Sequence, residues 1–443
     1  MNIQLSEHFT CGKLLRFTFP SIIMMVFSSI YGVVDGIFVS NFAGKTAFAA
    51  INLIMPYIMI FGALGIMVGT GGTALVSMIM GTGDKKRANE VFSLLISALV
   101  IGGIAMSAVA LLLLRPAAIL LGAEGEMIDA CVSYGRCTLP ALTALLLQNA
   151  FQSFCVAAEK PNLGLGLTVA AGIANIILDA LFVGVFGWGL EGAAVATAIS
   201  QCVGGILPLV YFALPNKSLL RLCKTKFDGS ALLRTCTNGS SELMSNISLS
   251  LVSMLYNFQL MEFAGEDGVA AYGVIMYVNF IFVAVFLGYA IGVAPIIGYH
   301  YGAENHPELK SLLCKSLMIV GTMAIILTAL AELLAAPLSG IFVSYDKSLY
   351  DMTLRAFMIY SLSFLLCGFN IFGSSFFTAL NNGLISALIS FLRTLVFQAA
   401  AVMLLPMLLE LDGIWYSIIV AELAALVLTA FFTVKYRTRY HYA

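Results

Sequence analysis

Long apolar stretches, separated by short polar or turn-forming breaks, run through the whole chain and limit what it can fold into. A helix needs about 20 consecutive apolar residues to cross the hydrocarbon core of a bilayer. Breaks such as 83–87 and 381–383 divide the chain into twelve stretches of at least that length. We therefore predict twelve membrane-spanning helices, with these approximate boundaries: 14–40, 47–80, 88–114, 131–156, 162–186, 190–214, 235–261, 269–299, 310–335, 354–379, 383–407 and 412–434.

The composition agrees with a membrane protein and excludes several other classes. Hydrophobic residues make up 60% of the 443 residues and charged residues only 10%, whereas soluble domains carry about 25% charged residues. The formal net charge is −1, so the charge balance predicts no nucleic-acid partner. The nine cysteines include no Cys-X-X-Cys pair, which argues against a metal cluster. We expect no enzymatic activity, no cofactor, and a lipid bilayer around the chain.

Lysine and arginine are distributed unevenly over the two sides of the predicted bundle. Most of them fall on the side that holds both termini and the loops after the even-numbered spans. The opposite loops and the helix entrances beside them hold only Lys45, Arg115, Lys347, Arg136 and Arg355. Because basic loops stay on the cytoplasmic side of a membrane, we predict that both termini are cytoplasmic. The chain is then a multi-pass protein of the inner (cytoplasmic) membrane.

The second half of the sequence repeats the first at an offset of 221 residues. The offset runs without gaps through six predicted spans and places these residues on partners of the same type: Gly71 on Gly292, Gly81 on Gly302 and Asn149 on Asn370. Because six is even, both halves enter the membrane from the same side and form a parallel repeat. We predict an all-α polytopic membrane protein whose twelve transmembrane helices form two six-helix lobes, related by a parallel pseudo-two-fold repeat. The lobes comprise residues 1–214 and 235–443, joined by a cytoplasmic linker, 215–234.

Several charged side chains fall inside the predicted spans. Each costs about 2.5–3.5 kcal/mol on insertion scales, so such residues are candidates for function. They are Asp35, Asp179, Glu242, Glu332, Glu422 and Arg393.

Two of these carboxylates lie at one depth in the first lobe. Asp35, Asp179 and Thr197 each fall roughly 8–10 Å inside the outer face, at a rise of 1.5 Å per residue. Asn175 precedes Asp179 by one turn, as Tyr31 precedes Asp35. Such oxygen ligands bind a small hard cation, with Na⁺ held by Asp35 and Asp179, or they hold a proton shared between carboxylates. The alternative is a polar cluster that only joins helices.

The second lobe does not copy this arrangement, because the offset places Tyr256 on Asp35 and Ala400 on Asp179. The lobes are therefore chemically specialised, and we expect the ion site in the first.

The second lobe has charges of its own. Arg393 and Glu422 each lie about ten residues into adjacent spans, from opposite faces, so matching depth predicts a buried ion pair. We expect this pair to be structural rather than functional. Glu242 lies about seven residues into its span. It either serves a substrate or a proton, or is a solvated group near the cytoplasmic mouth; if the spans are displaced, it is the next candidate partner for Arg393.

Three segments resemble the MATE (multidrug and toxic compound extrusion) transporters, and the bacterial DinF-like branch in particular. They are Tyr-Gly-Val-Val-Asp at 31–35, Asn-Ile-Ile-Leu-Asp at 175–179 and Gly-Ala-Ala-Val-Ala-Thr-Ala-Ile-Ser at 192–200. The resemblance covers the whole chain and implies an antiporter that exchanges H⁺ or Na⁺ for organic cations. It implies a bend of the first helix at Pro20. It also implies a cation site at Asp35, Asn175, Asp179 and Thr197, with a supporting polar network of Tyr31, Tyr134, Asn149 and Gln152.

Two other functions share parts of this pattern. A lipid-linked oligosaccharide flippase of the same superfamily would need a cationic cavity for its pyrophosphate, and only Arg393 lies deep in a span. An intramembrane aspartyl protease would need glycine before one aspartate, whereas Val34 and Leu178 stand there. We therefore predict a cation-coupled antiporter that exports organic, cationic drugs or metabolites by alternating access and works as a monomer.

Overall fold

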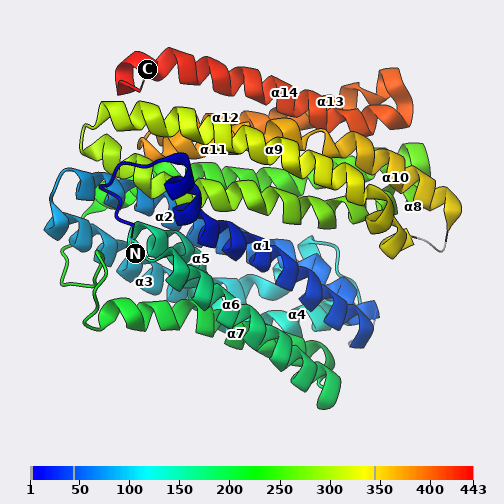
Figure 1. Cartoon of the computed structure of the whole chain (residues 1–443). Coiled ribbons are helices and arrows are strands. Elements are labelled where there is room, and N and C mark those ends of the chain that lie inside the picture. The colour runs from blue at the N-terminus through cyan, green and yellow to red at the C-terminus, as the bar shows by residue number, and fades with distance from the viewer. Residues whose placement is uncertain (1–2, 43–44, 344–345, 443) are drawn as a thin grey trace.

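The chain folds into a bundle of long helices (Figure 1). A computed structural model describes residues 3–42, 45–343 and 346–442, with the side chains of residues 33, 35–42 and 45–48 left out, and these residues form no strand. The α-helices are α1 (Cys11–Phe42), α2 (Lys45–Gly81), α3 (Lys85–Leu120), α4 (Glu126–Thr138), α5 (Leu142–Ala157), α6 (Pro161–Asp179), α7 (Gly189–Ala213), α8 (Gly229–Gly302), α9 (His306–Val343), α10 (Lys347–Ser361), α11 (Phe364–Ala379), α12 (Gly383–Phe391), α13 (Gln398–Leu404) and α14 (Pro406–Tyr440).

These helices combine into twelve spans, as the apolar stretches predict. A short 3₁₀ turn joins α4 to α5, and a π-helical turn joins α12 to α13, so each pair forms one span. The pair α10 and α11 forms another, bent by 46°. The long helix α8 contains two spans, because its backbone leaves the helical region at Gly265, where φ is +62°. Glycine lacks the Cβ that makes a positive φ costly for other residues, so it suits this sharp turn between two spans.

The spans form two lobes, α1–α7 and α8–α14 (Figure 1). In the first lobe, α1 packs on α6, α2 on α5, and α6 on α7; in the second, α8 packs on α11 and α12, and α11 on α14. Both ends of the chain lie at one end of the bundle in Figure 1, which we call the termini end, and the opposite one the far end.

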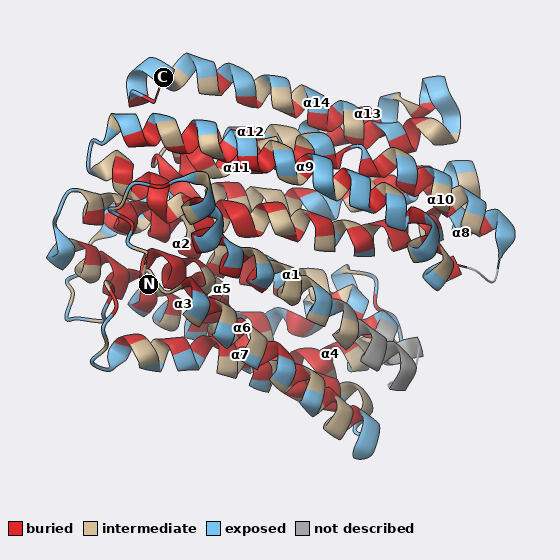
Figure 2. Cartoon of the chain, in the orientation of Figure 1, coloured by how far each residue is buried: buried red, intermediate tan, exposed pale blue. Residues whose placement is uncertain are grey.

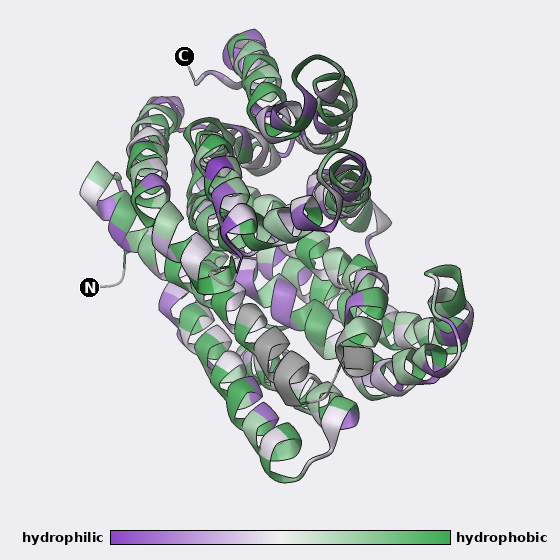
Figure 3. Ribbon diagram, turned by 90° about the vertical axis from the view of Figure 1, so that its right-hand side faces the viewer, coloured by the Kyte–Doolittle hydropathy of each residue, from purple (hydrophilic) through white to green (hydrophobic). Residues whose placement is uncertain are grey.

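The outward faces of the helices are apolar. Figure 2 shows buried residues on the faces between helices and exposed residues on the outside, and the ribbon seen from the far end in Figure 3 is mostly hydrophobic. Large apolar side chains such as Leu112, Leu120 and Leu384 are 79%, 88% and 78% exposed. Such a surface is stable against lipid and not against water, which fits the expected bilayer environment.

Small residues near the termini end bring the two lobes into close contact. A Cβ added at Gly81, the last residue of α2, would lie 2.0 Å from the carbonyl oxygen of Tyr299 on α8. A Cβ at Gly302, the last residue of α8, would lie 1.9 Å from the carbonyl oxygen of Met78 on α2. The offset of 221 residues relates Gly81 to Gly302 and Met78 to Tyr299, so the two contacts across the interface are equivalent.

The same symmetry holds further along the interface. Gly71 packs against the backbone of Thr235 and Gly239, and its repeat partner Gly292 packs against Thr18. The offset of 221 residues also relates Thr18 to Gly239. The interface between the lobes therefore follows a pseudo-two-fold axis, as the sequence repeat predicts, and small side chains permit the close approach of the helix backbones.

We expect that Gly302→Val opens this interface. Overpacking a tight contact costs about 1–3 kcal/mol, which shifts a two-state equilibrium by about 5- to 150-fold. The reporter is Ser77→Cys in a background without other cysteines, since Ser77 is fully buried and lies beside Gly298 between the lobes. Maleimide should label this thiol about tenfold faster in the Gly302→Val variant. Gly273→Val on the same helix meets no atom within 4 Å and should not change the rate; equal rates in all three proteins would contradict the prediction.

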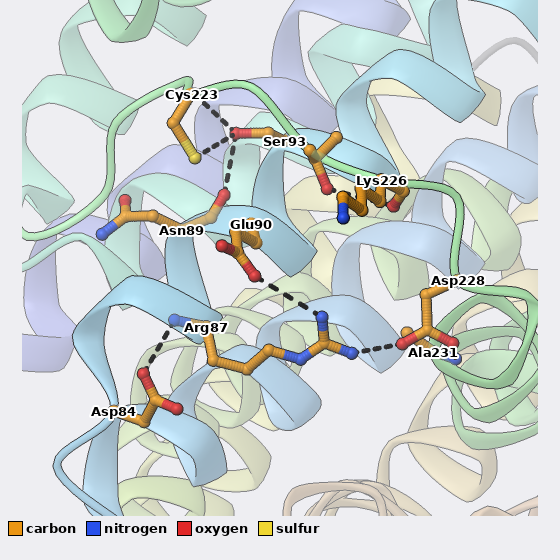
Figure 4. Close-up of polar contacts among 10 residues, drawn as sticks. Asp84, Arg87, Asn89, Glu90, Ser93, Cys223, Lys226, Asp228 and Ala231 are labelled. Carbon is orange, nitrogen blue, oxygen red and sulfur yellow. Dashed lines mark hydrogen bonds and ion pairs between the residues drawn. The ribbon is translucent and has the colours of Figure 1, made fainter.

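The segment between the lobes is held against α3 (Figure 4). The Ser93 hydroxyl accepts a hydrogen bond from the backbone N–H of Cys223 at 2.8 Å. The Asn89 side-chain oxygen accepts one from the backbone N–H of Arg221 at 2.6 Å. Asp228 caps α8 by accepting hydrogen bonds from the backbone N–H groups of residues 230 and 231. Because of this cap, residues 229–234, which the sequence places in the linker, are helical.

Asp228 also joins the two lobes, because the Arg87 guanidinium on α3 donates a hydrogen bond to its carboxylate (Figure 4). The N–H of Ala231 and this guanidinium hold the pKa of Asp228 below its ordinary value of 3.8. A carboxyl whose pKa is lower in the folded protein stabilises the fold above its unfolded pKa, and this contribution disappears as the pH falls through the folded value.

We expect Asp228→Asn to lower the unfolding temperature at neutral pH, because asparagine keeps a capping oxygen but loses the charge. The difference from the wild type should shrink below pH 3.8, the ordinary pKa of this carboxyl, and vanish when Asp228 is protonated. Thermal unfolding of the purified protein across this pH range measures it. Asp84→Asn is the matched control, since Asp84 caps α3 through the N–H of Arg87. A constant difference at every pH would mean that the charge does not contribute.

Candidate functional site

The first lobe carries a buried polar face on α6. Asn175 and Asp179 lie one turn apart on this helix and are 2% and 0% exposed. Because α6 packs between α1 and α7, the two side chains lie inside the lobe. Among the described residues, the Asn175 side-chain nitrogen has no hydrogen-bond partner, and neither has the hydroxyl of Thr197 on α7. An unsatisfied buried polar group costs about 1–3 kcal/mol. The amide nitrogen of Asn175 needs an acceptor such as water, and the Thr197 hydroxyl can bind a water or an ion.

The α1 side of this site is only partly described. The Tyr31 ring lies beside Gly172 of α6, where an added Cβ would be 3.1 Å from its Cδ1 atom. Gly172 is about one turn before Asn175, so Tyr31 borders the polar face. Asp35 belongs to α1, but its side chain lies outside the described residues. Its expected place beside Asp179 therefore stays a prediction.

Thr197 lies on α7 and is half-buried; its carbonyl oxygen accepts a hydrogen bond from the Ser200 hydroxyl at 2.8 Å. The expected roles of Asn175, Asp179 and Thr197 in binding an ion likewise stay predictions.

The residues of the expected supporting network are spread over α1, α4 and α5. Asn149 on α5 donates a hydrogen bond from its side chain to the carbonyl of Gly62 on α2, at 3.0 Å. Tyr134 on α4 is buried and Gln152 on α5 is half-buried. Pro20 lies inside α1, next to residues 21 and 22, whose backbone packs on Gly288 of the other lobe. A bend at Pro20 stays a prediction, since α1 is a continuous helix here.

Two π-helical turns accompany the deepest charges. Asp179 ends α6 and is followed directly by a π turn, Ala180–Val185, and Arg393 lies inside the second one, Leu392–Phe397. A π turn inserts extra backbone into a helix, re-aims the side chains around it, and is frequent at functional sites. No signal in the sequence marks either turn.

The second lobe contains the buried ion pair that the matching depths predict. The Nε atom of Arg393 donates to both carboxylate oxygens of Glu422, at 2.9 and 3.0 Å, and Nη2 lies 2.8 Å from one of them. Asn370 donates a hydrogen bond to the same carboxylate at 2.7 Å and receives one from Thr429 at 3.2 Å. No role is predicted for Asn370 from the sequence, although the repeat pairs it with Asn149.

Glu242 lies further from the start of its helix than the apolar boundary suggests. Since α8 begins at Gly229 and not near residue 235, Glu242 lies ~20 Å along the helix at 1.5 Å per residue. It lines a cavity of about 280 Å³ inside the second lobe, together with Arg393 and Glu422. Both expectations for this side chain, a role with a substrate or a proton and a solvated place near the cytoplasmic mouth, stay predictions.

Comparisons with known proteins agree with this architecture. The family model described as MatE matches the chain twice, over residues 20–181 and 243–403, once in each lobe. The chain is 23% identical over 416 residues to the multidrug export protein MepA of Staphylococcus aureus (strain MRSA252), covering 92% of this chain and 90% of that protein. For MepA of Staphylococcus haemolyticus (strain JCSC1435) the identity is 24%, with coverage of 96% and 94%.

Among solved structures, the chain resembles the outward-facing conformation of a multidrug resistance MATE family transporter of the MOP superfamily. The TM-score is 0.93 at 22% identity, over 99% of this chain and 98% of that one. This likeness supports the fold of two lobes with twelve spans.

Proposed function

This chain belongs to the MatE family and is a membrane transporter, and we propose that it is a cation-coupled antiporter that exports organic cations by alternating access. The observation that carries the proposal is the buried polar face of Asn175 and Asp179 in the first lobe. The two lobes pack against each other about a pseudo-two-fold axis. An internal carboxylate provides a binding site for a coupling ion, and two lobes that meet at a tight interface provide the moving parts.

In this proposal the coupling ion is H⁺ or Na⁺, held by the carboxylates of Asp179 and Asp35 with help from Asn175 and Thr197. Binding the ion neutralises a charge that is costly inside a membrane. A bound ion shifts the equilibrium between the inward-open and outward-open arrangements of the lobes when it binds one arrangement more tightly than the other. The substrates are drugs, as the name of the MepA relatives, multidrug export proteins, suggests, and we propose that they are organic cations.

The termini end is cytoplasmic in this proposal, because most basic loops lie there. The lobes meet at this end, where Gly81 and Gly302 pack against the opposite backbone. The structure then represents a state that is closed towards the cytoplasm, and export requires this contact to open and re-form. We also propose that one chain is the working unit, in the inner membrane of a bacterium.

The flippase alternative is less well supported by the charges. A pyrophosphate needs free cationic side chains, whereas Arg393 is bound by Glu422. The additional carboxylate of Glu242 in the same cavity makes its lining negative rather than positive.

The test is export of ethidium by purified protein in liposomes, with a Na⁺ gradient and a pH gradient imposed one at a time. We expect either the Na⁺ gradient or the pH gradient, directed inwards, to drive ethidium transport against the concentration gradient of ethidium. Collapse of that gradient with the matching ionophore should stop the transport. Ethidium movement that neither gradient alters would contradict the antiport mechanism.

A further inference from the structure

A further cavity lies at the termini end, where the two lobes meet. Its volume is about 330 Å³, within the ~300–1,000 Å³ typical of ligand pockets. Leu75 and Met78, near the end of α2, line it from the first lobe. The second lobe contributes residues near both ends of α8, in the turn after α11 and at the end of α14. The cavity is separate from the ion site proposed for the first lobe and from the cavity that Arg393 lines.

The charge of this lining is positive. Its charged side chains are two guanidinium groups, that of Arg234 on α8 and that of Arg439 on α14. In the part of the chain that the structure describes, neither forms an ion pair. Two cations that share a cavity repel each other, and an anion between them replaces this repulsion with attraction to both.

The nearest carboxylates do not neutralise these arginines. Arg234 also lines an adjoining cavity together with Asp84 and Asp228. Asp228 is bound by the guanidinium of Arg87 and caps α8, while Asp84 caps α3. Both carboxylates therefore have partners of their own, and the cavity between the lobes keeps its positive charge.

Aromatic rings position the guanidinium of Arg439. It lies 5.9 Å from the ring centroid of Tyr436 and 5.7 Å from that of Tyr440. The Tyr440 ring packs edge-on against Tyr301, another lining residue, with centroids 5.6 Å apart. A contact with ring faces uses no N–H donor, so the five N–H groups of the guanidinium remain available to an acceptor. Their planar arrangement matches the oxygen atoms of a phosphate group.

Exposed apolar side chains flank the two arginines. Leu233 directly precedes Arg234, and Val434 lies five residues before Arg439 on α14; both are exposed. Such side chains suit the acyl chains of lipids, while a headgroup reaches the arginines. Basic pockets between membrane helices on the cytoplasmic side bind the phosphate-bearing headgroups of anionic lipids, and the termini end is the cytoplasmic side in the topology proposed above.

We propose that this cavity binds a phosphate-bearing anion between Arg234 and Arg439. The headgroup of an anionic membrane lipid and a soluble phosphate compound share this chemistry, and the exposed apolar side chains favour the lipid. The inference goes beyond the transport activity, because it assigns a ligand that is neither substrate nor coupling ion.

The ligand also acts on the contact between the lobes. Asn381, in the same lining, donates a hydrogen bond from its side chain to the carbonyl oxygen of Ala74 on α2, at 3.2 Å. An anion in this cavity therefore contacts both lobes where they are closed. Because it binds the closed arrangement more tightly than an open one, it stabilises the closed arrangement.

Calorimetric titration of the purified full-length protein in non-ionic detergent tests the site. The probes are dioctanoyl phosphatidylglycerol, which is anionic, dioctanoyl phosphatidylcholine, which is zwitterionic, and inorganic phosphate. We expect the wild type to bind phosphatidylglycerol at least about tenfold more tightly than phosphatidylcholine. Arg439→Gln should weaken phosphatidylglycerol binding by about tenfold, and adding Arg234→Gln should abolish the preference. Arg437→Gln is the matched control, because Arg437 is exposed on the same helix and lies outside the lining.

Two further comparisons identify the ligand. Arg439→Lys keeps the charge but loses the planar set of donors, so it should weaken phosphatidylglycerol binding severalfold and less than Arg439→Gln. Binding of inorganic phosphate as tight as that of phosphatidylglycerol, and equally dependent on both arginines, would assign the site to soluble phosphate compounds. Equal affinities of the wild type and the double variant for phosphatidylglycerol and for phosphate would overturn the inference.

Maleimide labelling of Ser77→Cys, in a background without other cysteines, tests the effect on the lobes. Dioctanoyl phosphatidylglycerol should slow the labelling severalfold in the protein with both arginines and should not change it in the double variant. An unchanged rate in the protein with both arginines, despite binding that depends on them, would overturn the stabilisation of the closed arrangement.

Discussion

Replacing Asp179 by asparagine is expected to reduce gradient-driven export to the level of protein-free liposomes. Asp179 is fully buried at the end of α6, directly before the π turn Ala180–Val185. Asparagine has nearly the same shape and keeps one acceptor oxygen, so the helix and its packing should persist. It carries no ionisable charge, however, and cannot alternate between a charged and a neutralised state. The conformational equilibrium then loses its dependence on the ion.

Ethidium export from proteoliposomes under each ion gradient measures this effect, and thermal unfolding in detergent shows whether the variant is folded. Asp179→Asn should lose export and retain the unfolding temperature of the wild type, because asparagine preserves the packing at the end of α6. Asp129→Asn is the matched control in the first lobe, where the Asp129 side chain is 78% exposed. Normal export by a folded Asp179→Asn protein would remove Asp179 from the coupling mechanism.

The large features of the fold are predictable from the sequence because they depend on summed properties of long segments. Twelve spans follow from apolar length, and the pseudo-two-fold interface follows from an offset that pairs Gly81 with Gly302. The pairing of Arg393 with Glu422 follows from depth alone, since adjacent helices bring residues at one depth together. The chain belongs to the MatE family, whereas membership of the DinF-like branch stays a prediction.

Local features depend on single residues and are less predictable. The start of α8 at Gly229 depends on one cap, Asp228. The helix therefore begins more than one turn before the predicted boundary at residue 235, and Glu242 lies correspondingly further from its start. The π turns beside Asp179 and around Arg393 arise from tertiary packing, which no periodicity in the sequence reports. The repeat pairs Asn370 with Asn149. The residue that Asn370 contacts, Glu422, has no glutamate at the corresponding position of the first lobe, so the repeat alone does not predict this contact.

Glu422→Gln is expected to destabilise the protein strongly, by about 3–5 kcal/mol, because it leaves the Arg393 charge without its partner inside the lobe. Glutamine can still accept the hydrogen bond that Asn370 donates to Glu422 at 2.7 Å, so the loss isolates the charge. The Glu422 side chain is 2% exposed and that of Arg393 15%, and solvent therefore screens the remaining guanidinium poorly.

Adding Arg393→Met should restore much of the stability lost in Glu422→Gln, since removing both charges of a buried pair can be nearly neutral. Thermal unfolding in detergent of the wild type, both single variants and the double variant gives the coupling between the residues. The matched control is the exposed pair of Arg355 and Asp412 in the same lobe, whose side chains are 69% and 33% exposed. Asp412→Asn should cost no more than about 1 kcal/mol. Losses that simply add in the double variant would show that the Arg393–Glu422 contact contributes no net coupling, and the cavity wall would then depend on packing alone.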